Sequence, residues 1–208
     1  ALPTPEGEDD PSASVPLALQ SLFYRLQYGR GPGSTKDLTR SFGWTAYDHF
    51  VQHDVEELTR ILTDRLEERM KGTPVDGVLK ELFELKGRQY VDCLNVPFKS
   101  VTRFADRDLK LDVAGHADVY ASLAAYVAPE LMVGENRYAA DGHGYQDARK
   151  GVVFDAFPPV LTLHLKRFAY DFATDTAVKV NQRYAFPETL DLDRPPNGAR
   201  LFWDQVFP

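Results

Sequence analysis

The sequence has a single cysteine, Cys93, among 208 residues. One cysteine excludes an internal disulfide framework and any cysteine-rich zinc site. The sequence also lacks an uninterrupted run of about 20 apolar residues, which argues against a membrane-spanning helix. It has no excess of basic residues, because 24 Lys and Arg face 31 Asp and Glu, for a formal net charge of −7. A chain of this charge does not suit the phosphate backbone of nucleic acid and favours a partner with a basic surface.

The composition predicts a folded chain in a reducing compartment, the cytoplasm or the nucleus. Hydrophobic residues make up 43% of the chain, enough for a core of its own, and aromatic residues 12%. The sequence starts without Met and stops on an apolar stretch, so we expect one large domain or a piece of a larger one.

The first part of the chain is predicted to be helical after a solvated lead-in at residues 1–13. Ser14 is expected to cap the first helix, and Pro16 lies in its first turn. The glycines from Gly29 onward end this helix. Three more helical segments follow, over residues 35–41, 54–70 and 78–85. The second part is predicted to hold strands at residues 90–96, 109–113 and 160–168, an extended piece at 184–187, and a helix at 119–127. This segregation predicts an α+β fold.

The helix that starts after Asp54 has the clearest pattern in the chain. Its apolar residues recur at spacings of three and four, which predicts one buried face and a helix central to the core: Val55, Leu58, Leu62, Leu66 and Met70. Asp54 and Glu57 form an acidic analogue of a capping box. Capping is sufficient to explain both of those carboxylates. Gln52, His53 and Glu56 are not needed for a cap, and such a cluster of acceptors could also grip an extended basic peptide.

No nucleophile and base can be paired from the sequence. Cys93 lies in an alternating strand with no basic neighbour to lower its pKa, so we interpret it as a structural, semi-buried cysteine. His164 falls within a predicted strand, His143 in a glycine-rich turn, and His116 before a helix. None of them forms a catalytic set with Cys93 by spacing, and no ligand-type residues have the spacing of a zinc site.

The end of the late strand is the second informative segment. Lys166, Arg167, Phe168 and Tyr170 precede the acidic stretch at residues 171–175. A cation and two aromatic rings leaving a strand can line a groove. The alternative is an ordinary strand end whose Arg is bonded locally.

Taken together, these segments resemble the ubiquitin-specific proteases, and most closely the herpesvirus-associated subfamily. The resemblance runs from Pro3 to about Leu192. It is carried by ordered matches at residues 14–20, 38–44, 52–58, 70–73, 134–138, 150–152, 158–161 and 167–171. The family usually has Gln where this chain has Glu56, and many members hold zinc through two Cys-x-x-Cys pairs that this chain lacks.

The resemblance implies a papain-like, hand-shaped fold that is incomplete at both ends. Residues 14–85 would form the helical thumb, and residues 86–208 the fingers and part of the palm. The cysteine and histidine boxes would lie outside the chain, so no catalytic residue, metal or cofactor is assigned within it. The tail of ubiquitin would thread between thumb and palm under a mobile loop at residues 171–179. The substrate-binding residues would be Gln52, Asp54, Glu56, Arg167, Phe168 and Tyr170.

Three functions are compatible with this sequence. The first is a fragment of a cysteine-type deubiquitinase, which hydrolyses isopeptide bonds at the ubiquitin C-terminus and has ubiquitin and ubiquitinated proteins as partners. The second is a catalytically dead ubiquitin-binding module, and the third a peptide-binding α+β domain unrelated to ubiquitin. The coding sequence on either side would separate the first two.

Overall fold

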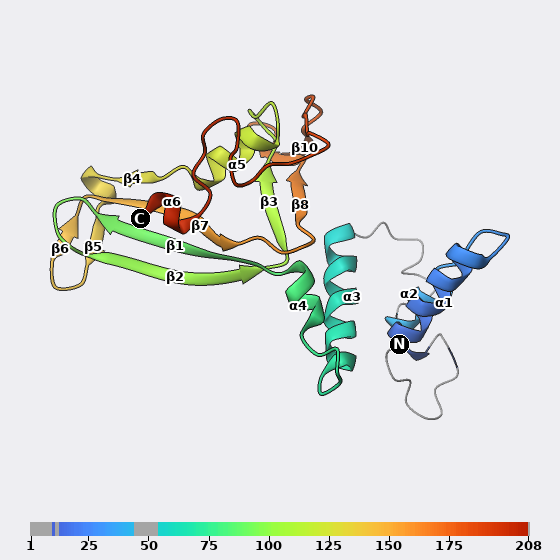
Figure 1. Ribbon diagram of the computed structural model, residues 1–208. Coiled ribbons are helices and arrows are strands. Elements are labelled where there is room, and N and C mark those ends of the chain that lie inside the picture. Colours follow the sequence, from blue (N-terminus) through green and yellow to red (C-terminus); the bar gives the residue numbers. More distant parts are fainter. Residues whose placement is uncertain (1–9, 11–12, 44–53, 208) are drawn as a thin grey trace. The chain divides into compact units, whose positions relative to one another are not determined.

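The computed structural model describes residues 10, 13–43 and 54–207, which belong to two compact units, Ala1–Lys80 and Glu81–Pro208 (Figure 1). Each unit is described by itself. Helices and strands are both present and are segregated along the chain, so the predicted α+β class is confirmed. Among the described residues, no helix has the length and apolar character needed to cross a membrane. Gln52 and His53 lie outside the described residues.

The first unit is helical. Its elements are α1 (Val15–Tyr28), α2 (Lys36–Ser41), α3 (Val55–Met70) and the start of α4 (Val78–Phe83). Ser14 occupies the N-cap position of α1 and Pro16 lies in its first turn, as predicted. Gly72 follows the end of α3 with a φ of 71°, a conformation that glycine adopts without steric cost.

The apolar faces of the first unit are less buried than the sequence pattern predicts. Met70 is the only buried residue of α3, and Val55 is 75% exposed. On α1, the apolar residues Phe23, Leu26 and Tyr28 are also exposed. The prediction that α3 is central to a core is therefore wrong for this chain. Periodicity identified the helix correctly but says nothing about whether another element covers its apolar stripe.

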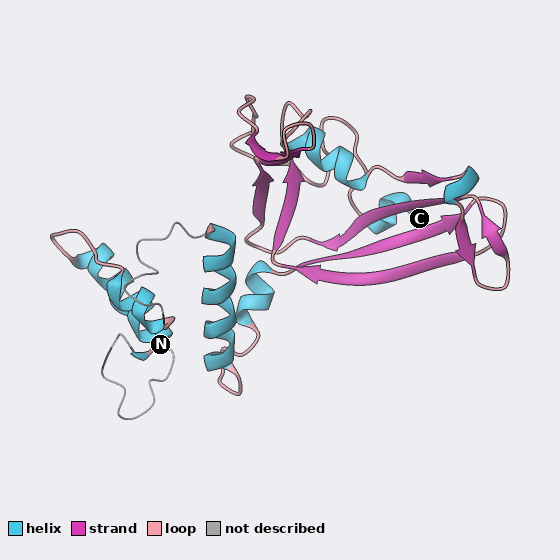
Figure 2. Cartoon of the chain, turned by 180° about the vertical axis from the view of Figure 1, so that it is seen from behind, coloured by secondary structure: helices cyan, strands magenta, loops and turns pink. Residues whose placement is uncertain are grey.

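The second unit is built on a four-stranded antiparallel sheet in the order β2-β1-β7-β4 (Figure 2). Its strands are β1 (Leu85–Cys93), β2 (Lys99–Asp106), β4 (Glu130–Met132) and β7 (Ala148–Ala156). β1 ends at Cys93, three residues earlier than predicted. Sequence reasoning missed β7, which pairs with both β1 and β4. Its Val153 and Phe154 are successive and both buried, so the strand lacks the alternation of a half-exposed strand.

The main core lies beside a second, parallel pair of strands, β3 (Asp108–Asp112) and β8 (Thr162–Lys166), and the helix α5 (Val119–Val127). β8 contributes the partly buried Leu163 and Leu165 to this core. The buried residues come from β3 and the residue after it, α5, the start of β1, β7 and the segments around residues 184 and 201: Leu85, Leu109, Leu111, Val113, Val119, Leu123, Val127, Phe154, Tyr184 and Leu201. Each fully buried leucine there contributes about 1.5–3 kcal/mol before entropy is counted. Tyr184 and its neighbours form the predicted extended piece, since Ala185 bridges to Asp118.

The remaining elements are short. They are a 3-10 turn (Gly134–Asn136), β5 (Tyr138–Ala140), β6 (Gly144–Gln146), β9 (Phe168–Asp171), β10 (Thr176–Lys179) and α6 (Trp203–Val206). The predicted strand at residues 160–168 is divided, because β8 ends at Lys166 and β9 begins at Phe168. The loop expected at residues 171–179 is instead the tip and return strand of a hairpin formed by β9 and β10.

Candidate functional site

The first candidate segment is the amino-terminal turn of α3. The Asp54 side chain accepts a hydrogen bond from the backbone N–H of Glu56, with 2.8 Å between nitrogen and Oδ1. Asp54 is therefore a helix cap, and its bond reaches the second helical residue rather than Glu57. Asp54 and Glu57 are exposed, and Glu56 is half-buried. Three carboxylates in one turn form an acidic surface, stabilised by the positive end of the helix dipole.

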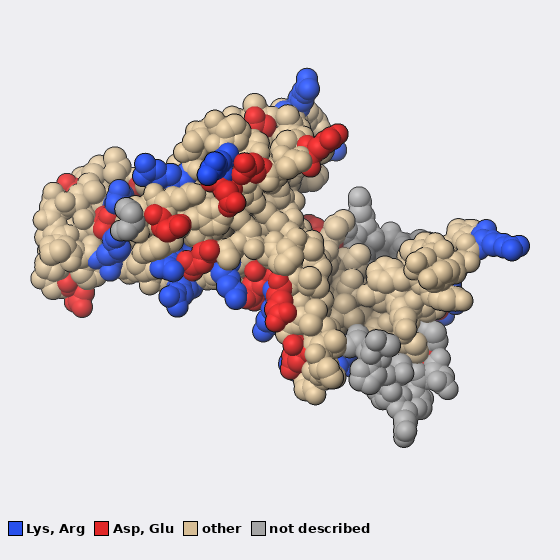
Figure 3. Space-filling view, in the orientation of Figure 1, with Lys and Arg blue, Asp and Glu red and all other residues tan. Residues whose placement is uncertain are grey.

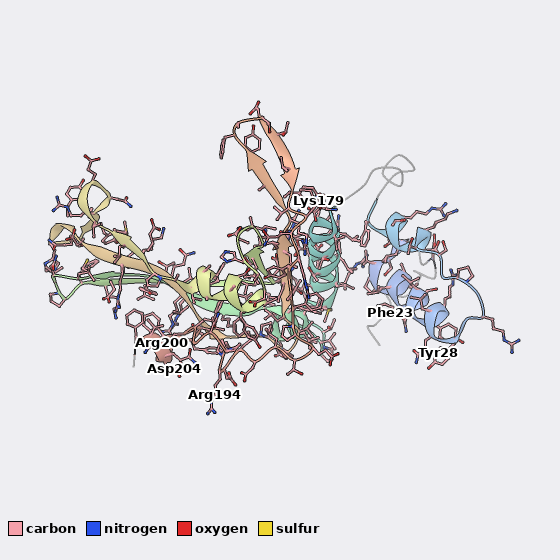
Figure 4. All side chains as sticks on the ribbon, turned by 90° about the horizontal axis from the view of Figure 1, so that it is seen from above. Phe23, Tyr28, Lys179, Arg194, Arg200 and Asp204 are labelled. Atoms are coloured by element: carbon pink, nitrogen blue, oxygen red, sulfur yellow. The ribbon has the colours of Figure 1, made fainter. Side chains whose placement is uncertain are left out.

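The second candidate segment is the hairpin of β9 and β10, which projects from the second unit with Lys179 at its base (Figure 4). Phe168 pairs with Lys179 and Tyr170 pairs with Ala177, so the two aromatic rings lie on the same face of the hairpin. Phe168 is 70% exposed and Tyr170 is 53% exposed. Exposed aromatic rings that are grouped on a projecting element are typical of an interaction surface.

Tyr170 also stabilises the tip of the hairpin. Its hydroxyl donates a hydrogen bond to Asp175 Oδ1. That bond raises the pKa of Tyr170 above its ordinary value. Asp175 has a φ of 54°, in the left-handed region that short polar residues tolerate in turns. The hydroxyls of Thr174 and Thr176 are 2.8 Å apart on either side of it.

Arg167 lies at the base of the hairpin and is half-buried. Its Nη1 donates to the backbone carbonyls of Val180 at 3.3 Å and Gln182 at 3.2 Å. Because these bonds join the two ends of the hairpin, Arg167 fixes the direction in which Phe168 and Tyr170 leave β8. This matches the alternative in which the arginine is bonded locally.

Gln182 is a positioning residue that sequence reasoning missed. Its Nε2 donates to the carbonyls of Val113 at 2.6 Å and His116 at 2.7 Å. Its Oε1 accepts from the backbone N–H of Gly115 at 3.2 Å. The hairpin base is thereby attached to the turn that precedes α5. A lone glutamine after a strand has no pattern that would have identified this role.

Cys93 is a structural cysteine, as its strand position predicted. It is buried at the end of β1 in a cluster with Ala140 and Ala148. Its backbone N–H donates to the carbonyl of Phe98 at 3.0 Å. His164 lies 3.6 Å from an oxygen of Asp108 on the adjacent strand, and His143 lies in the turn between β5 and β6. A thiol packed among small apolar side chains is not an accessible nucleophile.

The family to which this chain belongs follows from comparison with known sequences. The profile described as ubiquitin carboxyl-terminal hydrolase matches residues 3–199. The chain belongs to the ubiquitin carboxyl-terminal hydrolase family. This confirms, at the level of the family, the resemblance that the motifs indicated.

Similar hydrolases of this family occur in plants, fungi and animals. Ubiquitin C-terminal hydrolase 12 of Arabidopsis thaliana is 58% identical over 93% of the chain. Ubiquitin carboxyl-terminal hydrolase 15 of Saccharomyces cerevisiae is 53% identical over 90%, and ubiquitin carboxyl-terminal hydrolase 7 of Drosophila melanogaster is 48% identical over 91%. The chain spans 17%, 15% and 17% of these three relatives' lengths.

The span that matches this hydrolase family includes both candidate segments. Asp54 and Glu56 lie within residues 3–199, and so does the hairpin that carries Arg167, Phe168 and Tyr170. The structure brings the last three residues together on one hairpin, whereas Asp54 and Glu56 share the first turn of α3 in the other unit. Their role in binding substrate stays a prediction, as does the assignment of the two units to thumb, fingers and palm.

Proposed function

We propose that this chain is the ubiquitin-binding part of a cysteine-type deubiquitinase of the herpesvirus-associated subfamily, which hydrolyses isopeptide bonds at the ubiquitin C-terminus. The observation that carries the proposal is the family match over residues 3–199 together with 58% identity to a plant ubiquitin C-terminal hydrolase. The proposed partners are ubiquitin and ubiquitinated proteins, and the proposed compartment is the cytoplasm or the nucleus.

Within this enzyme the chain supplies two surfaces for the tail of ubiquitin. Asp54 and Glu56 provide carboxylates for the basic residues of the tail through charge-assisted hydrogen bonds, which are roughly twice as strong as neutral ones. Phe168 and Tyr170 provide exposed aromatic surface on one face of the hairpin. Arg167 acts indirectly, because its bonds to the Val180 and Gln182 carbonyls hold the hairpin base.

The bond-breaking groups belong to other parts of the whole protein in this proposal. Cys93 is the chain's single cysteine and is buried, so it does not attack an isopeptide bond. Gln52, two residues before Asp54 in the sequence, is also proposed to bind the substrate. If the whole protein lacked the catalytic cysteine and histidine, the same surfaces would make it a ubiquitin-binding module.

The proposal is tested on the whole protein with a substrate that carries a fluorogenic group on the C-terminus of ubiquitin. Phe168→Ala removes an exposed ring, so we expect KM to rise severalfold with little change in Tm. Val178→Ala is the matched control, because Val178 pairs with Ala169 and lies on the opposite face of the hairpin. An equal rise in KM for both variants would refute the assignment of the aromatic face, and absence of turnover in the parent protein would favour the binding module.

A further inference from the structure

Residues 190–199 run beside α5 on the second unit, and we call them the strap (Figure 1). The structure describes every residue of the strap, and none of them belongs to a helix or a strand. Leu190, Leu192 and Ala199 are partly buried against the main core, and Pro195 is buried. Because the strap has no ladder of backbone hydrogen bonds, its place beside α5 depends on side-chain contacts and side-chain hydrogen bonds.

Tyr120 on α5 attaches the strap at two points. Its hydroxyl accepts a hydrogen bond from the backbone N–H of Asp191 at 2.9 Å. Its backbone carbonyl accepts a second hydrogen bond from Nδ2 of Asn197 at 2.7 Å. Tyr120 is half-buried, whereas Asp191 and Asn197 are exposed. The Asn197 amide is therefore one end of a two-point attachment, and water can reach it.

Asn197 lies in a tight turn that also engages the rest of its side-chain amide. The backbone N–H of Gly198 donates to the carbonyl of Pro195 at 2.9 Å. Gly198 has a φ of 70°, which glycine adopts without steric cost. Oδ1 of Asn197 accepts from the backbone N–H of Ala199 at 3.2 Å. Both polar ends of the Asn197 amide and the N–H of the next residue are thus bonded in the folded chain.

Asn197 and Gly198 also form a chemically reactive pair. They are the only asparagine in the sequence that is followed by glycine, and that glycine. Glycine has no side chain, so its backbone nitrogen can approach the side-chain carbonyl of the residue before it. The Gly198 nitrogen loses its proton to water and bonds to Cγ of Asn197. The Cγ–Nδ2 bond then breaks, Nδ2 takes up a proton and leaves as ammonia, and a five-membered succinimide ring remains.

Water opens this ring at either of its two carbonyl carbons. Attack at Cγ breaks the bond that has just formed and leaves aspartate at residue 197. Attack at the main-chain carbonyl carbon breaks the original peptide bond instead, so that the chain continues through the side chain of isoaspartate. Neither product has the Nδ2 donor of Asn197, and isoaspartate also lengthens the backbone by its Cβ carbon.

The lost donor, rather than the added charge, is what disturbs the strap. Acidic and basic side chains are already interspersed over the surface of the second unit (Figure 3). One more carboxylate on such an exposed surface has a small effect by itself. At residue 197, however, a carboxylate oxygen would replace Nδ2 at 2.7 Å from the Tyr120 carbonyl, where two acceptors repel each other. Conversion of Asn197 therefore removes one of the two bonds that Tyr120 makes to the strap.

The folded chain holds this reaction back. Before the ring can close, the Gly198 N–H must leave the Pro195 carbonyl, and the Asn197 side chain must leave Tyr120. Both events require the strap to open. Exposed irregular segments open locally at a lower free energy than global unfolding requires. The rate of the reaction is therefore set by how often the strap opens.

We propose that Asn197 and Gly198 form a self-modification site that the fold guards. The bonds to Tyr120 and Pro195 keep Asn197 intact while the strap is in place, and opening of the strap converts Asn197 to aspartate or isoaspartate. Closing the strap does not reverse the conversion, so the strap stays weakly attached to α5 afterwards. The reaction uses water and releases ammonia. This proposal goes beyond the proposed deubiquitinase function and does not depend on it.

The first test follows residue 197 by peptide mapping of the whole protein during prolonged incubation in neutral buffer. Trypsin releases residues 184–200 as one peptide, because it does not cut before Pro195, and mass spectrometry detects the replacement of the amide by an acid. A synthetic peptide of residues 184–200 is incubated in parallel. We expect residue 197 to deamidate severalfold more slowly in the folded protein than in the peptide. It should still react faster than Asn95, Asn136 and Asn181, which glycine does not follow.

The second test loosens the strap without changing the reactive pair. Tyr120→Phe removes the hydroxyl that accepts from Asp191 and leaves the Tyr120 carbonyl in place. The loss of a hydrogen bond of ordinary strength changes an opening equilibrium by about two- to tenfold, so we expect Asn197 to deamidate faster by about this factor. Tyr126→Phe is the matched control, because it is the same change on the same helix, at a ring that packs against the main core. It should leave the rate unchanged.

Hydrogen exchange provides a readout that does not depend on the deamidation chemistry. The N–H groups of Gly198 and Ala199 should exchange faster in Tyr120→Phe, by the same factor as the deamidation. Asn197→Asp reproduces one product directly, and it should speed exchange across the strap and lower the Tm. Asn95→Asp makes the same change in the exposed bend after β1 and should leave both unchanged.

Two results would overturn the proposal. If residue 197 deamidates as fast in the folded protein as in the synthetic peptide, the fold does not guard the site. If amide exchange across the strap is the same in Asn197→Asp as in the parent protein, conversion of Asn197 does not weaken the attachment of the strap to α5.

Discussion

The hydroxyl of Tyr184 donates a hydrogen bond to Ser122 Oγ at 2.9 Å, inside the main core of the second unit. Ser122 in turn donates from Oγ to the carbonyl of Asp112 at 2.6 Å. Both side chains are buried. This relay joins the extended segment at Tyr184 to α5 and then to the end of β3. It holds the region next to the base of the β9-β10 hairpin, where Gln182 is bonded to the turn that follows β3.

Replacing Ser122, the middle of this relay, should lower the free energy of unfolding more than replacing Tyr184 at its end. Ser122→Ala leaves the buried Tyr184 hydroxyl without its acceptor, which costs about 1–3 kcal/mol. Tyr184→Phe removes the hydroxyl itself and should cost about 0.5–1.5 kcal/mol. The double variant should be less destabilised than the sum of the two, because no orphaned hydroxyl remains. Urea unfolding of the four proteins measures these differences, and strict additivity would show that the two groups are not coupled.

Tyr184 should also make the stability of the fold fall with rising pH in the alkaline range. Burial, above all, raises the pKa of Tyr184 above its usual value of about 10. The folded chain therefore binds the phenolic proton more tightly than the unfolded chain does. Its contribution to stability is complete below about pH 10 and is lost as the pH rises through the folded pKa.

Urea unfolding between pH 8 and pH 11 should show the free energy of unfolding fall above about pH 10. Burial also raises the pKa of Tyr90 and of Tyr126, so these groups contribute to this fall together with Tyr184. Tyr184→Phe should make the free energy of unfolding fall less steeply with pH, by at most about 1.4 kcal/mol per pH unit, without abolishing the fall. A slope that is the same in the variant and the parent would mean that Tyr184 titrates equally in both states.

Periodicity and turn residues predicted much of this fold because they act locally. The helix predicted at residues 119–127 is α5 with its observed ends, and the spacing of apolar residues in α3 extends to that helix's observed end, Met70. Those features depend on residues three or four positions apart. They are present in the sequence whether or not distant elements pack against them.

The features that the sequence did not reveal depend on contacts between distant residues. The sequence did not predict β7, because its buried Val153 and Phe154 do not alternate with polar residues. Gln182 positions the hairpin through backbone atoms of a turn more than 60 residues away. The aromatic residues at 168 and 170 were identified as candidate site residues, but their shared face follows from a pairing with β10 that was expected to be a loop.

Cys93 should be dispensable for function but not for stability. It is buried in an apolar cluster with Ala140 and Ala148, so Cys93→Ser places a hydroxyl where apolar side chains surround it. We expect a loss of about 1–3 kcal/mol in the free energy of unfolding.

We also expect the 208-residue chain alone to release no fluorophore from a ubiquitin C-terminal substrate. Turnover by the chain that disappears in Cys93→Ala would contradict the structural role of this cysteine.

Asp54 has two roles that one substitution can separate. As a cap it accepts from the Glu56 N–H, and losing a cap costs about 0.5–2 kcal/mol. Asparagine caps a helix about as well as aspartate does, so Asp54→Asn should leave the Tm of the whole protein nearly unchanged. The substitution removes the charge that is proposed to meet the basic tail of ubiquitin. It should therefore raise KM for a ubiquitin substrate at low salt.

Salt provides the control for Asp54, because exposed charges separated by more than the Debye length are largely screened. That length is about 30 Å at 0.01 M and about 3 Å at 1 M ionic strength. The difference in KM between Asp54→Asn and the parent should shrink as salt is added, whereas the severalfold effect of Phe168→Ala should persist. If KM and kcat at low salt are the same for Asp54→Asn and the parent, Asp54 is a helix cap alone, and the acidic surface of α3 does not meet the tail.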